Sequence, residues 1–294
     1  MSGTEPRRAL APAKVNLTLY VTGLRADGYH LLDSLVVFAG VGDRLTVAPA
    51  AGLSLSVSGP AAAGVPEDGS NLVLKAAERL RVLRGVTAGA RIALEKHLPH
   101  GGGIGGGSSD AAVAIRLLAD LWGVAPLTAA EALPLGADIP VCLAAPAPQR
   151  MRGIGEDLSP APALPPMWLV LVNPGVAMPT PAVFRAYDAR PAPVARVIAP
   201  PPEGLDFAGF AAWLAGHDND LTGVLADAEG PAHVPQIGVI LDLLRADLAC
   251  AAAQMSGSGS TCWGLFEGPG AAQAAAARIA QTHPDWWSVA APVL

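Results

Sequence analysis

Charged residues, and lysine above all, are scarce in this 294-residue sequence. Asp, Glu, Lys and Arg make up 15% of the chain against 51% hydrophobic residues, and only Lys75 and Lys96 follow Lys14. No stretch gathers Lys and Arg into a basic stripe, and the formal net charge is −6. Because duplex binding needs clustered cations to neutralise phosphates, we do not expect nucleic acid as a partner. A lysine in apolar surroundings is correspondingly informative.

Long hydrophobic runs and paired cysteines are also missing. No apolar run reaches the roughly 18 residues of a membrane span, and residues 1–14 lack the hydrophobic region of a signal peptide. The three cysteines, Cys142, Cys250 and Cys262, are widely spaced in apolar segments, which favours buried, reduced residues over disulfides or metal ligands. The sequence therefore predicts a globular, cytoplasmic protein with no membrane segment and no metal held by a cluster of its own side chains.

Glycine, by contrast, is concentrated in one segment. Six of the seven residues over 101–107 are glycine, and Ser108, Ser109 and Asp110 lead into an apolar pattern of helical spacing over 111–122. Backbone N–H groups on such a turn, followed by the positive end of a helix, form an anion site that most often takes phosphate. We expect Ser108, Ser109 or Asp110 to cap the helix. A flexible linker is the alternative, but linkers seldom separate a strand from a capped helix.

Three familiar phosphate loops differ from this segment. A P-loop requires lysine where Ser108 stands. The dinucleotide fingerprint GxGxxG matches, but it needs an acidic residue ending a second strand about 20 residues later, where Leu121 and Trp122 continue the helical pattern. A protein-kinase loop needs a later strand lysine and an HRD-type loop, which this sequence lacks. A nicotinamide oxidoreductase therefore stays only as a weak alternative.

The segment over 12–21 alternates polar and apolar residues, as a strand with one apolar face does. Lys14 and Asn16 share its polar face, where they either line a cleft or face solvent. Tyr29 and His30 follow an Asp-Gly turn, either as surface residues or as a stacking platform for a base.

A further candidate is Asp138, which stands in the apolar segment LGADIPVCL over 135–143. The residues allow two interpretations of this carboxylate. It forms a turn or caps a helix, or it is a general base placed where water is scarce.

The remaining pattern mixes strands and helices without strict alternation, which favours an α+β fold. Further strands are expected over 35–48, with Gly42-Asp43 as a hairpin turn, and over 53–58, 90–94, 168–172 and 287–292. Helices are expected after an Asn71 cap and near 128–134, 206–215, 235–249 and 270–281. A proline-rich change in composition separates two predicted domains, 1–158 and 159–294, and 190–204 is expected to be an exposed proline-rich loop. A Gly/Ser turn over 255–260 echoes the first glycine loop.

Four motifs together resemble the GHMP small-molecule kinases. They are PAKVNLTL, LPHGGGIGGGSSDAA, LGADIP and MSGSGST, and they occur in the family's order over residues 12–266. The resemblance implies an N-terminal domain with a left-handed βαβ unit and a C-terminal ferredoxin-like domain. It also implies ATP and Mg²⁺ as cofactors, with ATP phosphates on Pro99, Gly101, Gly102, Gly103, Gly105, Gly106, Gly107, Ser108 and Ser109.

The resemblance further implies roles for single residues. Lys14 and Asp138 match the family's catalytic pair. ADGYH and PTPAVF resemble the branch of the family whose small-molecule substrate is cytidine diphosphate-linked methylerythritol. In that branch the substrate-binding positions match Asn16, Tyr29, His30, Asp138, Thr180 and Phe184.

The implied function is ATP-dependent phosphorylation of that substrate's 2-hydroxyl, in a protein that is a monomer or homodimer. Two further alternatives are open. One is a different kinase of the same family, acting on homoserine, mevalonate or a sugar. The other is a catalytically inactive regulatory binder, which the presence of both Lys14 and Asp138 disfavours.

Overall fold

The computed structural model describes residues 5–190, 198–226 and 232–294. Contacts group the chain into two units. The first comprises residues 1–13, 41–98 and 105–145, and the second comprises 14–40, 99–104 and 146–294. Each unit is therefore built from segments that are separated along the chain. The predicted domains, 1–158 and 159–294, instead divide the chain at a single point, and this division stays a prediction.

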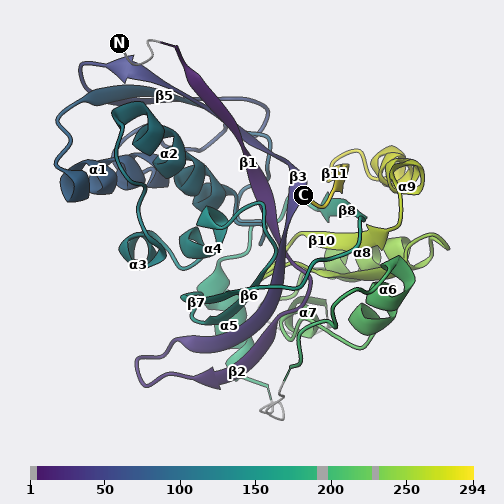
Figure 1. Ribbon diagram of the computed structural model, residues 1–294. Coiled ribbons are helices and arrows are strands. Elements are labelled where there is room, and N and C mark those ends of the chain that lie inside the picture. Colours follow the sequence, from purple (N-terminus) through teal and green to yellow (C-terminus); the bar gives the residue numbers. More distant parts are fainter. Residues whose placement is uncertain (1–4, 191–197, 227–231) are drawn as a thin grey trace. The chain divides into compact units, whose positions relative to one another are not determined.

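A long strand, β3 (His30–Ala50), contributes to both units (Figure 1). Its first part pairs antiparallel with β2 (Tyr20–Leu24) and β6 (Gln149–Gly153) in the second unit, and β6 pairs with β7 (Asp157–Pro160). Its last part pairs antiparallel with β5 (Gly89–Glu95) in the first unit. The strand β1 (Arg7–Asn16) also pairs with β3.

The first unit contains a parallel βαβ arrangement, in which α1 (Leu72–Arg84) connects β4 (Leu53–Ser58) to β5. Asn71 caps α1, as expected, by accepting a hydrogen bond from Val73 N at 2.8 Å. The helix α1 packs against α2 (Gly106–Trp122), and the two lie side by side in Figure 1. Three short helices complete the unit: α3 (Ala129–Ala132), η1 (Leu133–Leu135) and α4 (Ile139–Leu143).

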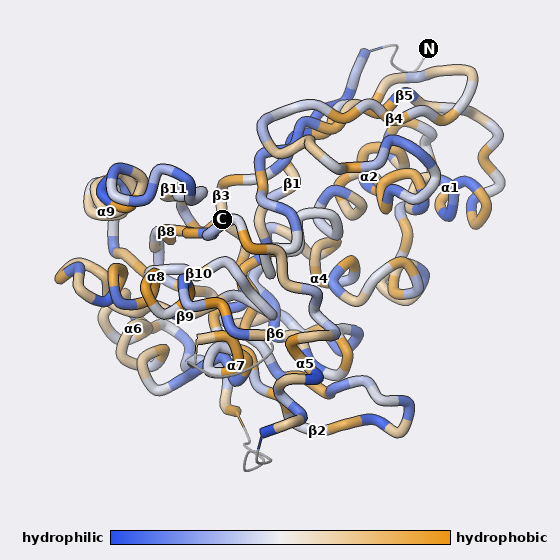
Figure 2. Tube along the Cα trace, turned by 180° about the vertical axis from the view of Figure 1, so that it is seen from behind, coloured by the Kyte–Doolittle hydropathy of each residue, from blue (hydrophilic) through white to orange (hydrophobic). Residues whose placement is uncertain are grey.

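The second unit contains a four-stranded antiparallel sheet in the order β11-β8-β10-β9. Its strands are β8 (Trp168–Asn173), β9 (Ala252–Met255), β10 (Cys262–Phe266) and β11 (Trp287–Pro292). With α8 (Pro235–Arg245) before β9 and α9 (Pro269–Thr282) before β11, this is the ferredoxin-like order β-α-β-β-α-β. Figure 2 shows β8 as hydrophobic, in keeping with its buried residues 169–172. The predicted α+β class is confirmed.

Between β8 and α8 the described residues form three helices: α5 (Thr180–Asp188), α6 (Phe207–Ala215) and α7 (Thr222–Ala226). The sequence indicated α6, whereas α5 and α7 were not predicted. They contact each other and pack with α8 in the core of the second unit. Of the expected proline-rich loop, residues 191–197 lie outside the described residues.

The expected hairpin turn at Gly42-Asp43 is wrong, because β3 runs through both residues. A Cβ at Gly42 would lie 2.0 Å from the Ala11 carbonyl oxygen, so glycine allows β1 to approach closely. Asp43 is fully buried. Here the glycine allows two strands to pack closely and the aspartate is buried, although a Gly-Asp pair is typical of turns.

Within the described residues, no helix is both long and apolar enough to cross a membrane.

Candidate active site

The glycine loop connects the two units, since 99–104 belongs to the second and 105–107 to the first. Gly103 has a φ of 73°, and a Cβ there would lie 2.3 Å from the Ser256 carbonyl oxygen. The Ser256 hydroxyl donates to Gly103 O at 3.0 Å, and Thr261 N donates to Gly102 O at 3.0 Å. Ser256 and Thr261 therefore hold the first half of the loop through its carbonyl oxygens, and the close approach at Gly103 requires glycine.

The helix α2 begins earlier than expected, and its cap is not a side chain. Gly105 is the N-cap residue with φ of 62°, and no side-chain hydrogen bond caps the helix. The expectation that Ser108, Ser109 or Asp110 caps it is wrong, because all three lie inside the first two turns. The first N–H groups of a helix have no acceptor within it, so this end of α2 presents donors and a positive dipole to a ligand.

A buried charge cluster of Asp43, Lys96 and Asp110 underlies the start of α2. Lys96 Nζ contacts Asp43 Oδ2 and donates to Asp110 Oδ2 at 2.7 Å. The side chains of all three are 4% exposed or less. Asp43 Oδ1 also accepts from Leu98 N at 2.9 Å. A Cβ at Gly106 would lie 3.6 Å from Lys96 Nζ, so the cluster lies against the first residue of α2.

Burial and charge act in opposite directions on this cluster. Burial lowers the pKa of Lys96, but Asp110 and Asp43 outweigh it and the net shift is upward. Burial raises the pKa of Asp110 to about 7, against the lowering effect of Lys96. Among the described residues, Asp110 Oδ1 and Ser109 Oγ are buried without a hydrogen-bond partner.

The raised pKa of Asp110 predicts a pH dependence of stability. Folded Asp110 keeps its proton to about pH 7, whereas an unfolded Asp loses it near pH 4. Between these values the folded state binds more protons, so this residue's contribution to the free energy of unfolding falls as pH rises. Urea unfolding from pH 4 to 7 should show a smaller decline for Asp110→Asn than for the unchanged protein. If the free energy of unfolding changed with pH in the same way in both proteins, the raised pKa of Asp110 would be contradicted.

Lys14 and Asn16 lie at the end of β1, in the second unit. Lys14 Nζ donates to Asn16 Oδ1 at 2.9 Å, and Asn16 Nδ2 donates to Ser34 Oγ at 2.7 Å. Asn16 N donates to Ser256 Oγ at 3.1 Å, and Asn16 O accepts from Trp263 Nε1 at 3.0 Å. Lys14 is 4% exposed, which excludes a solvated edge residue. Asn16 is therefore fixed by hydrogen bonds of both its backbone and its side chain, and its Oδ1 holds the Lys14 ammonium.

Asp138 occupies the N-cap position of α4 in the first unit, where Pro140 lies in the first turn. Its side chain makes no capping hydrogen bond, and the residue is half-buried. Asp138 thus lies in a turn that leads into α4, as one of the two interpretations expected, although its side chain does not cap the helix. A role in chemistry stays a prediction.

The structure groups the other predicted substrate residues around α5. His30 begins β3, and its ring stacks on Phe184 with centroids 4.4 Å apart and an interplanar angle of 19°. Tyr29 is 58% exposed beside it. Thr180 Oγ1 lies 2.9 Å from Ser258 Oγ, so the second Gly/Ser turn contacts α5. The sequence indicated His30 and Phe184 separately, and the structure joins them.

Asp188 was not a predicted site residue. Its Oδ1 lies 2.7 Å from His30 Nε2. The sequence held a signal for it, because Thr180, Phe184 and Asp188 recur every four residues, as residues on one face of a helix do.

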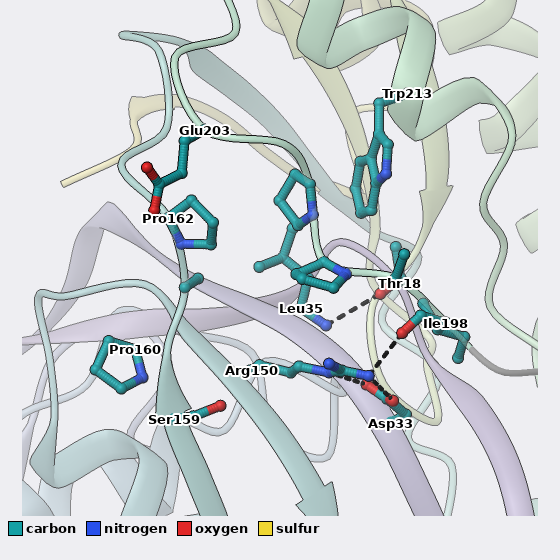
Figure 3. Close-up of a pocket in the computed structure, with 14 residues that line it drawn as sticks. Thr18, Asp33, Leu35, Arg150, Ser159, Pro160, Pro162, Ile198, Glu203 and Trp213 are labelled. Carbon is teal, nitrogen blue, oxygen red and sulfur yellow. Dashed lines mark hydrogen bonds and ion pairs between the residues drawn. The ribbon is translucent and has the colours of Figure 1, made fainter.

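A separate cavity of about 350 Å³ lies within the second unit and shares no residue with the predicted site (Figure 3). At one side, Arg150 Nε donates to Asp33 Oδ1 at 3.0 Å and its Nη2 donates to the Ile198 carbonyl oxygen at 2.7 Å. Trp213 and several prolines form the rest of the wall. The ion pair joins β3 to β6, and the hydrogen bond from the same arginine attaches Ile198 to them.

All three cysteines are thiols; Cys142 and Cys262 are buried, as expected, whereas Cys250 is only half-buried. Burial raises the pKa of the Cys250 thiol to about 11 and raises that of Cys262 further, so neither is a nucleophile at neutral pH. No group of three His, Cys, Asp or Glu side chains in the described part of the chain is placed to hold a metal ion.

Comparison with known proteins places this chain in a family. Residues 71–146 match the family model of the GHMP kinases N terminal domain, and 204–285 match that of the GHMP kinases C terminal domain. The chain belongs to the GHMP kinases. This membership removes the nicotinamide oxidoreductase alternative.

Within the family, the chain is similar to proteins named 4-diphosphocytidyl-2-C-methyl-D-erythritol kinase. It is 53% identical to that of Jannaschia sp. (strain CCS1) over 290 residues, which cover 98% of this chain and 97% of the relative. It is 52% identical to that of Paramagnetospirillum magneticum, with 97% of each chain covered.

Comparison with solved structures also finds members of this family. A crystal structure of 4-(cytidine 5'-diphospho)-2C-methyl-D-erythritol kinase matches with a TM-score of 0.74 and 36% identity, over 98% of this chain and 99% of that one. Homoserine kinase from Cytophaga hutchinsonii matches with a TM-score of 0.63 and 17% identity, over 100% of this chain and 96% of that one. The latter likeness concerns the fold alone.

Proposed function

We propose that this protein transfers the γ-phosphoryl group of ATP to the 2-hydroxyl of 4-diphosphocytidyl-2-C-methyl-D-erythritol. The products are the 2-phosphate and ADP, in the non-mevalonate (MEP) route to isoprenoid precursors. The observation that carries the proposal is the 53% identity over nearly the full length to a kinase named for this substrate. The site chemistry described above is consistent with it.

The ATP phosphates would lie along the glycine loop and the N-terminus of α2. The N–H groups of Gly106, Gly107 and Ser108 begin a helix that no side chain caps, and its dipole favours phosphate at this end. The first half of the loop is fixed by Ser256 and Thr261. Catalysis of phosphoryl transfer is mostly positioning and electrostatics, so a rigid loop is what the reaction needs.

The serine hydroxyl oxygens at the N-terminal end of α2 are suitable ligands for Mg²⁺. The Ser109 hydroxyl is buried without a partner and Ser108 is half-buried, so either oxygen would hold the ion together with phosphate oxygens. Mg²⁺ is commonly bound through substrate phosphates with few protein ligands, and the described residues offer no larger cluster. When bound, the ion would neutralise charge on the triphosphate.

Asp138 and Lys14 would act on the acceptor hydroxyl. A tertiary alcohol is a weak acid, so a base within hydrogen-bond reach assists as its oxygen attacks phosphorus. We assign the base to Asp138, whose carboxylate is not used in capping. The Lys14 ammonium, held by Asn16 at 2.9 Å, would stabilise negative charge on the transferring phosphoryl group.

The cytosine of the substrate would bind at Tyr29, His30 and Phe184. Tyr29 is exposed and available for stacking. One face of Phe184 packs on His30, so the aromatic pair forms one wall of the base site. Each base–aromatic stack contributes roughly 1–3 kcal/mol. Thr180, beside Ser258, would contact the remainder of the substrate.

ADP release tests the proposal directly. The protein is assayed with ATP, Mg²⁺ and 4-diphosphocytidyl-2-C-methyl-D-erythritol, with mevalonate and homoserine in parallel. We expect turnover with the cytidyl substrate alone. Turnover confined to another alcohol would contradict the proposed substrate and the proposed cytosine site, but the proposal of kinase activity would stand. The cytoplasmic location and the monomeric or dimeric state stay predictions.

A further inference from the structure

The ring of His30 is held by two residues of α5. Its Nε2 lies 2.7 Å from Asp188 Oδ1, and its face stacks on Phe184. The His30 side chain is 10% exposed and that of Asp188 is 50% exposed. Because Phe184 and Asp188 are one helical turn apart, a single rigid helix fixes both the plane of the ring and its rotation within that plane.

The contact with Asp188 decides which ring nitrogen carries the proton. An ionised carboxylate only accepts hydrogen bonds, so His30 Nε2 must be the donor. In the neutral imidazole the other nitrogen, Nδ1, is then an acceptor. Among the described residues, His30 Nδ1 has no hydrogen-bond partner, so it is available to a ligand.

An acceptor at this position distinguishes the pyrimidine bases. Cytosine carries an exocyclic amino group, which donates, whereas the corresponding oxygen of uracil accepts. Nδ1 as an acceptor pairs with the amino group and opposes the uracil oxygen. A site built to make one hydrogen bond discriminates strongly against a ligand that leaves it unpaired.

We propose that Asp188 is a positioning residue that makes the base site specific for cytosine over uracil by holding the proton on His30 Nε2. This inference rests on the proposed function, because it concerns the base of the same substrate. Asp188 acts through His30 and makes no contact with the reacting atoms.

The test exchanges an acceptor at position 188 for a donor. In Asp188→Lys the ammonium donates to Nε2, which places the proton on Nδ1 and favours the uracil oxygen. In Asp188→Asn the amide supports either tautomer. CDP and UDP are measured as competitors of the cytidyl substrate at saturating ATP. Asp242→Asn, an exposed aspartate on α8, is the control.

We expect the unchanged protein and Asp242→Asn to prefer CDP. The preference should fall by roughly tenfold or more in Asp188→Asn, the effect of one mismatched hydrogen bond, and reverse in Asp188→Lys. The ¹⁵N chemical shifts of the His30 ring, assigned with His30→Gln, should show the proton moving from Nε2 to Nδ1 in Asp188→Lys. Thermal melting of each variant monitors folding separately.

The outcomes separate the two proposals. If the unchanged protein binds neither nucleotide, the proposed function fails. If it turns over the cytidyl substrate but binds CDP and UDP equally, or if folded Asp188→Lys keeps the CDP preference, the role of Asp188 is overturned while the function stands.

Discussion

Replacement of Asp138 by asparagine is expected to reduce turnover by about 10²- to 10⁴-fold, the usual contribution of a positioned general base. The amide has nearly the same shape but cannot accept the proton of the hydroxyl. Because the Asp138 side chain makes no capping bond to α4, the substitution removes no helix cap. Steady-state kinetics give kcat, and ATP binding, measured by calorimetry, should stay unchanged.

Asp285→Asn, at an exposed position before β11, is the matched control and should keep full turnover. Asp138→Asn with near-normal kcat would remove Asp138 as the base. A loss of ATP affinity along with kcat would instead indicate damage to the first unit.

Replacement of Lys96 by methionine should lower the free energy of unfolding by about 3–5 kcal/mol, as expected when one partner of a buried ion pair is removed. Methionine fills similar volume but leaves the buried Asp43 carboxylate without its cation and the buried Asp110 side chain without its hydrogen-bond donor. The first turn of α2 rests on this cluster, so the KM for ATP should rise as well. Urea unfolding measures the stability and initial rates measure the KM.

The control is Lys75→Met, at an exposed position of α1, which should change stability by less than about 0.5 kcal/mol. Adding Asp110→Asn to Lys96→Met should recover part of the loss, because it removes a buried acidic group. If Lys96→Met lowered the free energy of unfolding by less than about 1 kcal/mol, Lys96 would not be needed to neutralise the buried acidic groups.

Elements with strong local patterns were predictable from the sequence. The Asn71 cap and the apolar face of α1 are confirmed by the buried residues Val73, Ala76, Ala77 and Leu80. The exception is Leu83, which is 43% exposed in the last turn of the helix. The strands β4 and β8 follow their expected ranges closely. In these segments the burial of one face and the local propensity agree, so periodicity is sufficient.

The errors occurred where distant contacts decide. Asp43 finds its partners at Lys96 and Leu98, more than 50 residues away, and no local pattern contains that information. Asp110 has the residue type of a cap but lies inside α2, paired with Lys96. In each case tertiary pairing overrode the usual preference of the residue.

The candidate site was predictable in its motifs but not in its connections. The glycine-rich sequence predicted a phosphate loop, and the family resemblance predicted roles for Lys14, Asp138 and the base site. The hydrogen bond between His30 and Asp188 joins β3 to α5 across 158 residues. It depends on α5, a helix that was not predicted although Thr180, Phe184 and Asp188 have helical spacing.

The buried thiols supply a built-in reporter of unfolding. At pH 8 a thiol with a pKa of about 11, as for Cys250, is ionised in only about one molecule in a thousand, whereas an unfolded thiol near 8.5 is ionised in about a quarter. Alkylating reagents attack the ionised form, so Cys250 and Cys262 become reactive chiefly when the second unit opens. Because both lie in that unit, the rate of their modification would follow its local opening in the native protein without any introduced label.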